Sequence, residues 1–443
     1  MDRSLVRRWL IPIIFFETYL TVVALLFFFG PWPWIVPNPA EIAIYLAAAN
    51  VVVFLGYVAS RPALGRVAQE TEEERIRKGI FWLRVSTAAS VALTVPTSLA
   101  RTGDFFPNVL ASLSNLGAVY SAGLRETADG GPFVFFEYVR MFAYPLLSAQ
   151  LPLTVAFWRR AGRFVRAAAV SSITFYLLIF IGRGQNKGLA DIVALLPFFL
   201  VLAWGRRPMP SLRKLCISVG VVVAAALVLL VFFAGTQIQR IGGAHPDGVY
   251  YFGRLKLVAD QNYWLTYWMP EPAQMTIESL ARYLGQGYQA MALTFNYEHQ
   301  STLGAGHSMF VARNFDRLLH TDFFTSASLP ALLDAQWGWP MYGLWHSIYP
   351  WLASDVGYLG ALPCMAAFGF LLGLSWGAAF KSGSIVWMGM LPMMLVLFFY
   401  IPGNNQIFQS GETTVAFFML APAVALKLVY PKWSLSRFFM PRR

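Results

Sequence analysis

Ten long apolar runs divide this chain, and each is close to the length that a helix needs to cross a bilayer. The core of a bilayer takes about 20 consecutive apolar residues per helix, and backbone polar groups inside it must bond within the protein. Only 13% of the residues are charged, against roughly 25% in soluble domains. The pattern predicts an all-α, polytopic helical membrane protein with about ten transmembrane helices. The runs lie near residues 9–30, 40–60, 79–99, 133–157, 165–182, 187–205, 215–235, 356–380, 385–402 and 413–430.

The first apolar run resembles a signal peptide, with Arg3, Arg7 and Arg8 ahead of it. Its apolar part is too long for the hydrophobic region of such a peptide, and no clear cleavage site of small residues follows. We therefore expect this run to be the first retained helix. The two cysteines, Cys216 and Cys364, both sit inside apolar runs, so we expect no disulfide.

The connections between the runs alternate in their content of Lys and Arg. Taken alternately along the chain, the connections that include both termini hold 22 of these residues, whereas the connections between them hold 10. Since cytoplasmic loops collect Lys and Arg, the bias predicts that both termini are cytoplasmic. It divides the chain into an N-terminal bundle of about seven spans (1–235), a large periplasmic loop (236–345) and a C-terminal segment of about three spans (346–443).

The large loop is the one soluble-looking part of the sequence. About 110 residues without structure are unusual in a compact protein, so we expect this loop to be folded and functional. Residues 272–293 read as a helix that a glycine stops and restarts, and residues 309–320 read as a short amphipathic helix. All five histidines fall in this loop or at its edge. A smaller external segment, 100–132, has helical spacing typical of an interfacial helix.

Two arginines lie within or near apolar runs, at Arg84 and Arg140. A charge at the centre of a membrane helix costs about 2.5–3.5 kcal/mol on insertion scales, so we expect both to face the bundle interior or a wet cavity. Glu137 precedes Arg140 by three residues and lies on the same helix face. It is therefore the predicted partner of Arg140.

A short polar stretch, Gly-Arg-Gly-Gln-Asn-Lys at 182–187, joins the fifth and sixth apolar runs. Its glycines allow backbone N–H groups to turn toward a ligand, and Lys187 opens the next helix, whose free N–H groups favour an anion. Together with Arg183, these features indicate a phosphate site. The alternative is a turn at the membrane surface, whose cations contact lipid headgroups.

The large loop adds further cations and the candidate bases. Its Lys and Arg residues suit an anionic, lipid-linked substrate, and they are Arg240, Arg254, Lys256, Arg282, Arg313 and Arg317. Histidine is the side chain that titrates near neutral pH, and His299 and His346 are accompanied by Asp355. Residues 334–355 are rich in Trp and Tyr, which suit a membrane interface and also stack on sugar rings.

Several function classes are disfavoured by the same sequence. The net charge of +12 fits the cytoplasmic excess of Lys and Arg in membrane proteins, and no basic patch interleaves with base-stacking aromatics, so we expect no nucleic acid partner. The sequence shows no zinc spacing, no HExxH and no nucleotide-binding glycine motif. We therefore expect neither a metal nor another cofactor.

Four stretches of the chain resemble the bacterial oligosaccharide repeat-unit polymerases, the Wzy-type O-antigen polymerases. "IGRGQNKGLADIVALL" (181–196) is similar to the family's Gly-Arg-Gly turn, and "YLGQGYQAMALTFNYE" (283–298) to a stretch of its periplasmic loop. "SDVGYLGALPCMAAFGFLLG" (354–373) is similar to the opening of the span after that loop, although Val356 stands where an aromatic is usual. "AVYSAGLRETADGG" (118–131) is similar to the earlier external segment.

The resemblance implies a reaction at the periplasmic face of the bacterial inner membrane. A growing glycan on undecaprenyl diphosphate is transferred to the non-reducing end of a lipid-linked repeat unit, and the diphosphate lipid leaves. Preorganised cations stabilise such a leaving group, and a base accepts the proton of the acceptor hydroxyl. The implied catalytic residues are His299, His346 and Asp355, and the implied diphosphate-binding residues are Arg183, Lys187, Arg254, Arg282, Arg125 and Arg313. A chain-length regulator is a further partner of such enzymes.

Three other functions fit parts of the pattern. An O-antigen ligase shares the donor and leaving group, but delivers the glycan to lipid A–core. A glycosyltransferase that uses a monophosphate polyprenyl donor typically has acids in its first external loop, where this chain offers only Glu41. A lipid or glycan transporter favours charges within spans, short external loops and internal repeats.

Overall fold

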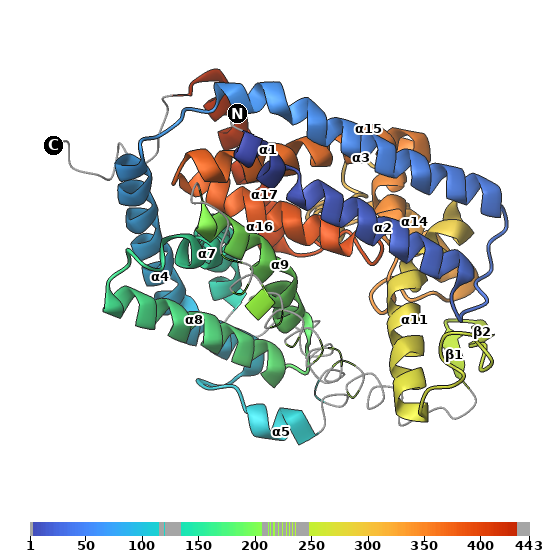
Figure 1. The fold of residues 1–443 in the computed structure, drawn as a ribbon. Helices are drawn as coiled ribbons and strands as arrows, with labels where there is room; N and C mark the ends of the chain where they lie inside the picture. The colour runs from blue at the N-terminus through green and yellow to red at the C-terminus, as the bar shows by residue number, and fades with distance from the viewer. Residues whose placement is uncertain are drawn as a thin grey trace.

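The computed structural model describes residues 3–114, 134–205 and 248–431, with single positions at 119 and between 211 and 235. The described chain is mainly helical (Figure 1). Its elements in chain order are α1 (Arg3–Trp9), α2 (Ile11–Phe29), α3 (Pro39–Arg66), α4 (Glu72–Thr102), α5 (Val109–Ser114), α7 (Val134–Phe157), α8 (Arg163–Gly182), α9 (Lys187–Trp204), β1 (Val249–Phe252), β2 (Leu255–Val258), α11 (Glu271–Thr294), α12 (Met309–Leu319), α13 (Phe323–Ser326), α14 (Leu329–Trp337), α15 (Ile348–Lys381), α16 (Ile385–Tyr400) and α17 (Gly411–Val429).

Seven of the described helices are long and apolar enough to cross a membrane, judged by their length and composition. This confirms the prediction of an all-α polytopic membrane protein. The seven are α3, α4, α8, α9, α15, α17 and the stretch Val6–Phe29, which joins the end of α1 to α2. The shorter apolar helix α16 and the 24-residue helix α7 pack among them. The predicted span at 215–235 lies mostly outside the described residues.

Helices α3 and α15 lie side by side along much of their length (Figure 1). Glycines allow their backbones to touch: a Cβ at Gly56 would lie 1.9 Å from the carbonyl oxygen of Ala366, and one at Gly369 would lie 2.3 Å from that of Val53. In lipid, helices have no hydrophobic driving force to associate, so they depend on close packing, which small residues at their interface allow. This pair forms the centre of the buried core.

The connections between helices gather at two opposite ends of the bundle. At one end, which we call the loop end, Trp32 Nε1 donates to the carbonyl of Glu278 (2.8 Å), and Ser347 N donates to that of Gly403 (2.7 Å). The loop end therefore holds the described connections 30–38, 183–186, 248–347 and 401–410.

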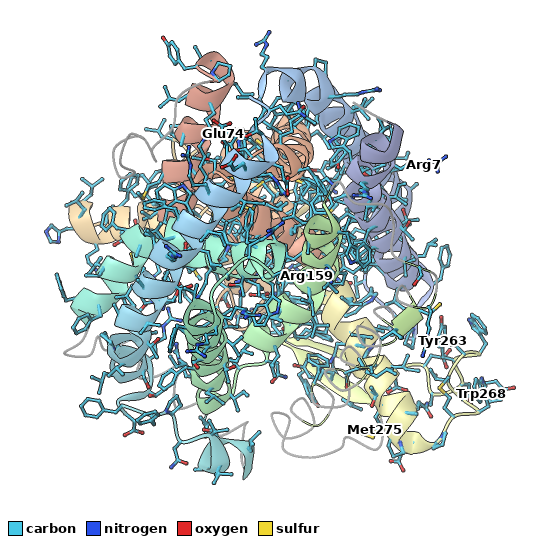
Figure 2. The ribbon with its side chains drawn as sticks, turned by 60° about the vertical axis from the view of Figure 1, so that its left-hand side comes forward. Arg7, Glu74, Arg159, Tyr263, Trp268 and Met275 are labelled. Carbon is cyan, nitrogen blue, oxygen red and sulfur yellow. The ribbon has the colours of Figure 1, made fainter. Side chains whose placement is uncertain are left out.

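The other end, the opposite end, holds connections 67–71, 158–162 and 382–384. There, Gly383 N donates to Glu70 Oε2 at 2.9 Å. Figure 2 shows Arg7 and Glu74 toward the opposite end, far from Tyr263, Trp268 and Met275 of the large segment. In their described parts, the connections rich in Lys and Arg and those poor in them thus lie at different ends of the bundle.

The large segment is folded, but it differs from the prediction in two details. It includes a two-stranded antiparallel hairpin, β1–β2, that the all-α prediction did not anticipate. Helix α11 runs without a break through Gly285 and Gly287, so the predicted glycine stop is wrong. A Cβ at Gly285 would lie 2.9 Å from the Trp34 indole, and one at Gly287 would lie 2.1 Å from the carbonyl oxygen of Pro402. These glycines permit close packing of the segment on the bundle.

Helix α15 starts earlier than the predicted span and is broken near its first third. Gly357 has φ 67° and ψ 170°, values that glycine adopts more readily than other residues. Before the break, residues 348–355, with Tyr349 and Trp351, are buried, whereas Val356 beside the break is exposed. The break separates this buried first part from the long apolar stretch that follows.

Candidate functional site

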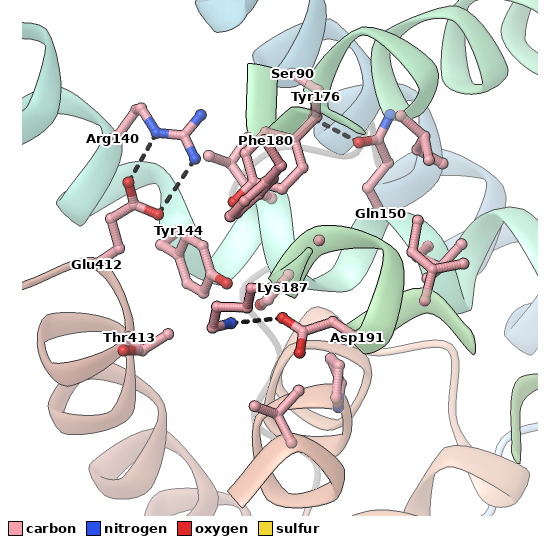
Figure 3. A pocket seen from close by; sticks show the side chains of 18 of the residues that line it. Ser90, Arg140, Tyr144, Gln150, Tyr176, Phe180, Lys187, Asp191, Glu412 and Thr413 are labelled. Carbon is pink, nitrogen blue, oxygen red and sulfur yellow. Dashed lines mark hydrogen bonds and ion pairs between the residues drawn. The ribbon is translucent and has the colours of Figure 1, made fainter. Parts of the chain in front are cut away.

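A cavity of about 300 Å³ lies inside the bundle, between helices α4, α7, α8, α9, α16 and α17 (Figure 3). Its ionisable residues occupy the parts of these helices nearest the loop end: Arg101 is the penultimate residue of α4, Lys187 is the first of α9 and Glu412 is the second of α17. The polar residues of its wall are Ser90, Thr94, Thr97, Arg101, Arg140, Tyr144, Ser148, Gln150, Ser172, Tyr176, Lys187, Asp191, Gln406, Ser410, Glu412 and Thr413.

Arg101, Arg140 and Glu412 lie on one wall of this cavity, and together with the half-buried Glu137 behind them they form an ion-pair network. Arg140 donates from Nε and Nη2 to the Glu412 carboxylate, at 2.9 and 3.2 Å, and from Nη1 to Thr97 Oγ1 at 3.0 Å. Arg101 binds Glu137 in a bidentate pair, at 2.9 and 3.0 Å, and also donates to Glu412. The predicted pairing of Arg140 with Glu137 is therefore wrong, because a neighbouring helix supplies each partner.

The predicted phosphate turn ends at this cavity, although its parts act differently from the expectation. The N–H groups of Arg183, Gly184 and Gln185 donate to carbonyls at the end of α8, so they are already used within the turn. Lys187 faces the cavity, bonds Asp191 at 2.5 Å and lies 5.6 Å from the centre of the Tyr400 ring. Lys187, rather than the backbone N–H groups of the turn, is therefore the part of this stretch that can contact a ligand in the cavity.

Neutral polar groups line the far side of the cavity from the ion pairs (Figure 3). Ser90 Oγ donates to Gln150 Oε1, and Gln150 Nε2 donates to Ser172 Oγ, both at 2.7 Å. Such amides and hydroxyls match the hydrogen-bonding pattern of a polar, uncharged group.

The described cations of the large segment do not line this cavity, and Arg240 lies outside the described residues. Arg282 is buried under Tyr250, with its guanidinium carbon 3.6 Å from the ring centre, and burial lowers its pKa from the usual value. Arg254 is exposed in the hairpin turn, and Arg313 is exposed near the Tyr342 ring. Arg125 lies outside the described residues.

Of the three predicted bases, His346 is the most deeply enclosed. Its side chain is fully buried, with the rings of Trp339 and Trp351 on either side at 6.5 and 6.1 Å between centres. Burial lowers its pKa to about 3, so the imidazole is neutral at physiological pH. Its surroundings are those of a packed core residue.

Asp355 holds a loop in place. Its Oδ1 accepts hydrogen bonds from the N–H groups of Thr302 and Gly304 and from the Thr302 hydroxyl, while its Oδ2 accepts from His307 N–H at 2.8 Å. Four donors occupy the carboxylate, which leaves it little capacity to accept a further proton. His299, by contrast, is exposed and packs against Gly357 at the break in α15.

Sequence reasoning missed four ionisable groups of the site: Arg101, Glu137 as its partner, Asp191 and Glu412. Arg101 and Glu412 lie just outside the predicted spans 79–99 and 413–430 and within one turn of a helix end, so the sequence alone places them in connections. The available signal was that charges at the corresponding ends of several spans meet once the helices bundle. The described residues contain no group of three or more His, Cys, Asp or Glu placed to hold a metal ion.

Comparison with protein-family models, with curated proteins and with solved structures gives no match to this chain.

Proposed function

We propose that this protein is a membrane glycosyltransferase that moves a glycan from a polyprenyl diphosphate carrier to a lipid-linked oligosaccharide. In this proposal the chain crosses the bacterial inner membrane about ten times, with both termini cytoplasmic and the loop end facing the periplasm. The assignment as a repeat-unit polymerase is supported by the family resemblance of the four stretches quoted above.

The observation that carries the proposal is the cavity with Arg101, Arg140 and Lys187 on its wall. These cations come from three different helices and meet at the end of the bundle where the connections are poor in Lys and Arg. Charged side chains among apolar helices are costly, and they commonly mark a pathway or a site. A lipid-linked diphosphate places its phosphates near the membrane surface, where this cavity lies.

Each part of the proposed reaction can be matched to particular side chains. Guanidinium and ammonium groups held in place before the reaction stabilise the charge that develops on a departing diphosphate. None of the three predicted bases lines the cavity, and His299 alone is exposed, so we propose it as the base that takes the proton of an acceptor hydroxyl brought to it by the bound substrate. His346 and Asp355 then support the fold around the site.

The test is elongation by the purified protein in liposomes that contain a synthetic lipid-linked repeat unit. We expect a ladder of products, and we expect Arg101→Gln to reduce its rate by roughly a hundredfold, as for loss of one charge-stabilising donor. The matched control is Arg84→Gln, on the same helix but exposed on its outer surface, which should elongate at the wild-type rate.

The outcomes of this assay separate the related functions. Transfer to lipid A–core without a ladder would identify a ligase instead. No transfer by well-folded wild-type protein, with both lipid-linked substrates present, would rule out the proposed glycosyltransferase.

A transporter is the second candidate, because ionisable residues paired across helices inside a bundle are also typical of translocation pathways. The ion-pair network of Arg101, Glu137, Arg140 and Glu412 is the observation that favours it. Uptake of a polar or lipid-linked glycan into proteoliposomes, without elongation, would support this candidate over the enzyme.

A further inference from the structure

The cations of the cavity are all neutralised by carboxylates of the same chain. Arg101 pairs with Glu137, Arg140 pairs with Glu412, and Lys187 pairs with Asp191. The described part of the wall is therefore close to charge-balanced, although its arginines are those that suit an anion. An incoming anion has to compete with groups that are already in place.

Glu412 is the carboxylate with which an incoming anion competes for donors of both arginines. It occupies Nε and Nη2 of Arg140, and it shares Nη2 of Arg101 with Glu137 (Figure 3 shows the Arg140 pair). An anion that takes Nε and Nη2 of Arg140 together with Nη2 of Arg101 has to displace Glu412 from these donors. Glu137 can keep its bidentate contact with Arg101 throughout.

We propose that an anionic phosphate group binds this cavity by displacing Glu412 from Arg101 and Arg140, and that the displaced carboxylate takes up one proton from water. The inference rests on the proposed function only for the identity of the natural ligand, a polyprenyl diphosphate. The physical reason is that Glu412 is buried, so an ionised carboxylate without its cations and beside a phosphate is strongly disfavoured.

Among the described residues around Glu412, no other carboxylate bonds both arginines. Helix α7 presents Glu137, Arg140 and Tyr144, helix α4 presents Arg101, and helix α8 presents Tyr176. Helix α9 contributes the pair Lys187–Asp191, helix α16 contains no charged residue, and α12 reaches the start of α17 with the Phe310 ring. Glu412 is thus the carboxylate whose protonation releases Arg140 and the Nη2 contact of Arg101, while Glu137 stays on Arg101.

The experiment measures binding of two inorganic probes to the full-length protein in detergent, by isothermal titration calorimetry. With inorganic diphosphate at about pH 7.5, Glu412→Gln should bind roughly tenfold more tightly than wild type, because an uncharged amide competes poorly for charge-assisted donors. Sulfate serves for the pH series, since its charge is constant. Its affinity for wild type should rise by up to about tenfold per pH unit on going from pH 7.5 to about pH 5.5. In Glu412→Gln this slope should vanish.

The matched control is Glu70→Gln, which removes a buried, ion-paired carboxylate at the opposite end of the bundle and should leave both affinities unchanged. If Glu412→Gln does not fold, proton uptake by wild type still decides: sulfate binding measured in two buffers of different ionisation enthalpy should show about one proton taken up per anion.

The proposal is overturned if Glu412→Gln folds and binds no more tightly than wild type, or if wild type takes up no proton. Its failure is distinguishable from that of the proposed function. Elongation without tighter binding by Glu412→Gln would discard the displacement and keep the enzyme. Proton-coupled anion binding without elongation would keep the displacement and discard the enzyme.

Discussion

At the scale of single residues, the intramembrane arginines show what can and what cannot be predicted about an ion pair from spacing within one helix. The cost of a charge among apolar helices correctly indicated that Arg140 needs a partner and a polar environment. Helical spacing suggested Glu137, but the structure pairs Arg140 with Glu412, which is 272 residues away in the chain. Arg84 differs again, because it is exposed on α4. Burial and partner are properties of the packed helices, and a three-residue spacing within one helix does not reveal them.

Asp355 gives a prediction at this scale. Asp355→Asn replaces one carboxylate oxygen with an NH₂ group, so at least one of the N–H groups of Thr302, Gly304 and His307 loses its acceptor. We expect residues 302–307 to exchange amide hydrogens faster, and the protein to lose about 1–3 kcal/mol of stability. Hydrogen exchange followed by mass spectrometry measures both the exchange of residues 302–307 and the exchange of the most protected amides, which reports the stability of the whole protein.

The control for this prediction is Asp322→Asn, an exposed residue at the start of α13 whose side chain makes no capping hydrogen bond. It should leave exchange in 302–307 unchanged. Unaltered exchange in Asp355→Asn itself would show that the loop is held by other contacts.

At the scale of elements, glycines have roles that their position in the sequence alone does not reveal. Those in α11 were predicted to stop the helix, whereas the helix continues and the glycines contact Trp34 and Pro402. Gly357, at the start of the predicted span 356–380, is the residue at which α15 breaks. A glycine permits both an unusual φ and a close approach, and only the neighbouring elements decide which one is used.

The packing of α3 on α15 yields a prediction with a control on the same helix. Gly56→Ala places a methyl group 1.9 Å from the carbonyl oxygen of Ala366, so the helices must separate. We expect a loss of roughly 1–3 kcal/mol of stability, as for other overpacked interiors. The measurement is the thermal unfolding midpoint in detergent.

Gly65→Ala, near the end of α3, faces open space and should be neutral or stabilising by up to about 1 kcal/mol through helix propensity. Equal midpoints for the Gly56 and Gly65 variants would contradict the close backbone contact between α3 and α15.

At the scale of the whole molecule, the division of the connections into two ends predicts sidedness. In a background with Cys216→Ser and Cys364→Ser, we expect Trp268→Cys to react with a membrane-impermeant maleimide added to spheroplasts. Glu74→Cys should react only after the membrane is permeabilised. Both positions are exposed and, among the described residues, lie at different ends of the bundle. Labelling of Glu74→Cys from outside, with Trp268→Cys protected, would invert the proposed topology and remove the site from the periplasm.

The sequence by itself determined the class of the protein, because apolar runs of bilayer length have one stable form, a helix that satisfies its own backbone. It also located Lys187 and the need of Arg140 for a partner. The tertiary structure alone decided that Arg101, Arg140, Lys187, Asp191 and Glu412 share one cavity, and that His346 and Asp355 are enclosed by their surroundings. The reason is physical. The hydrophobicity of a span is a property of consecutive residues, so it can be recognised in the sequence. A charged site is formed between helices, by residues whose separation in the sequence gives no information about their distance in space.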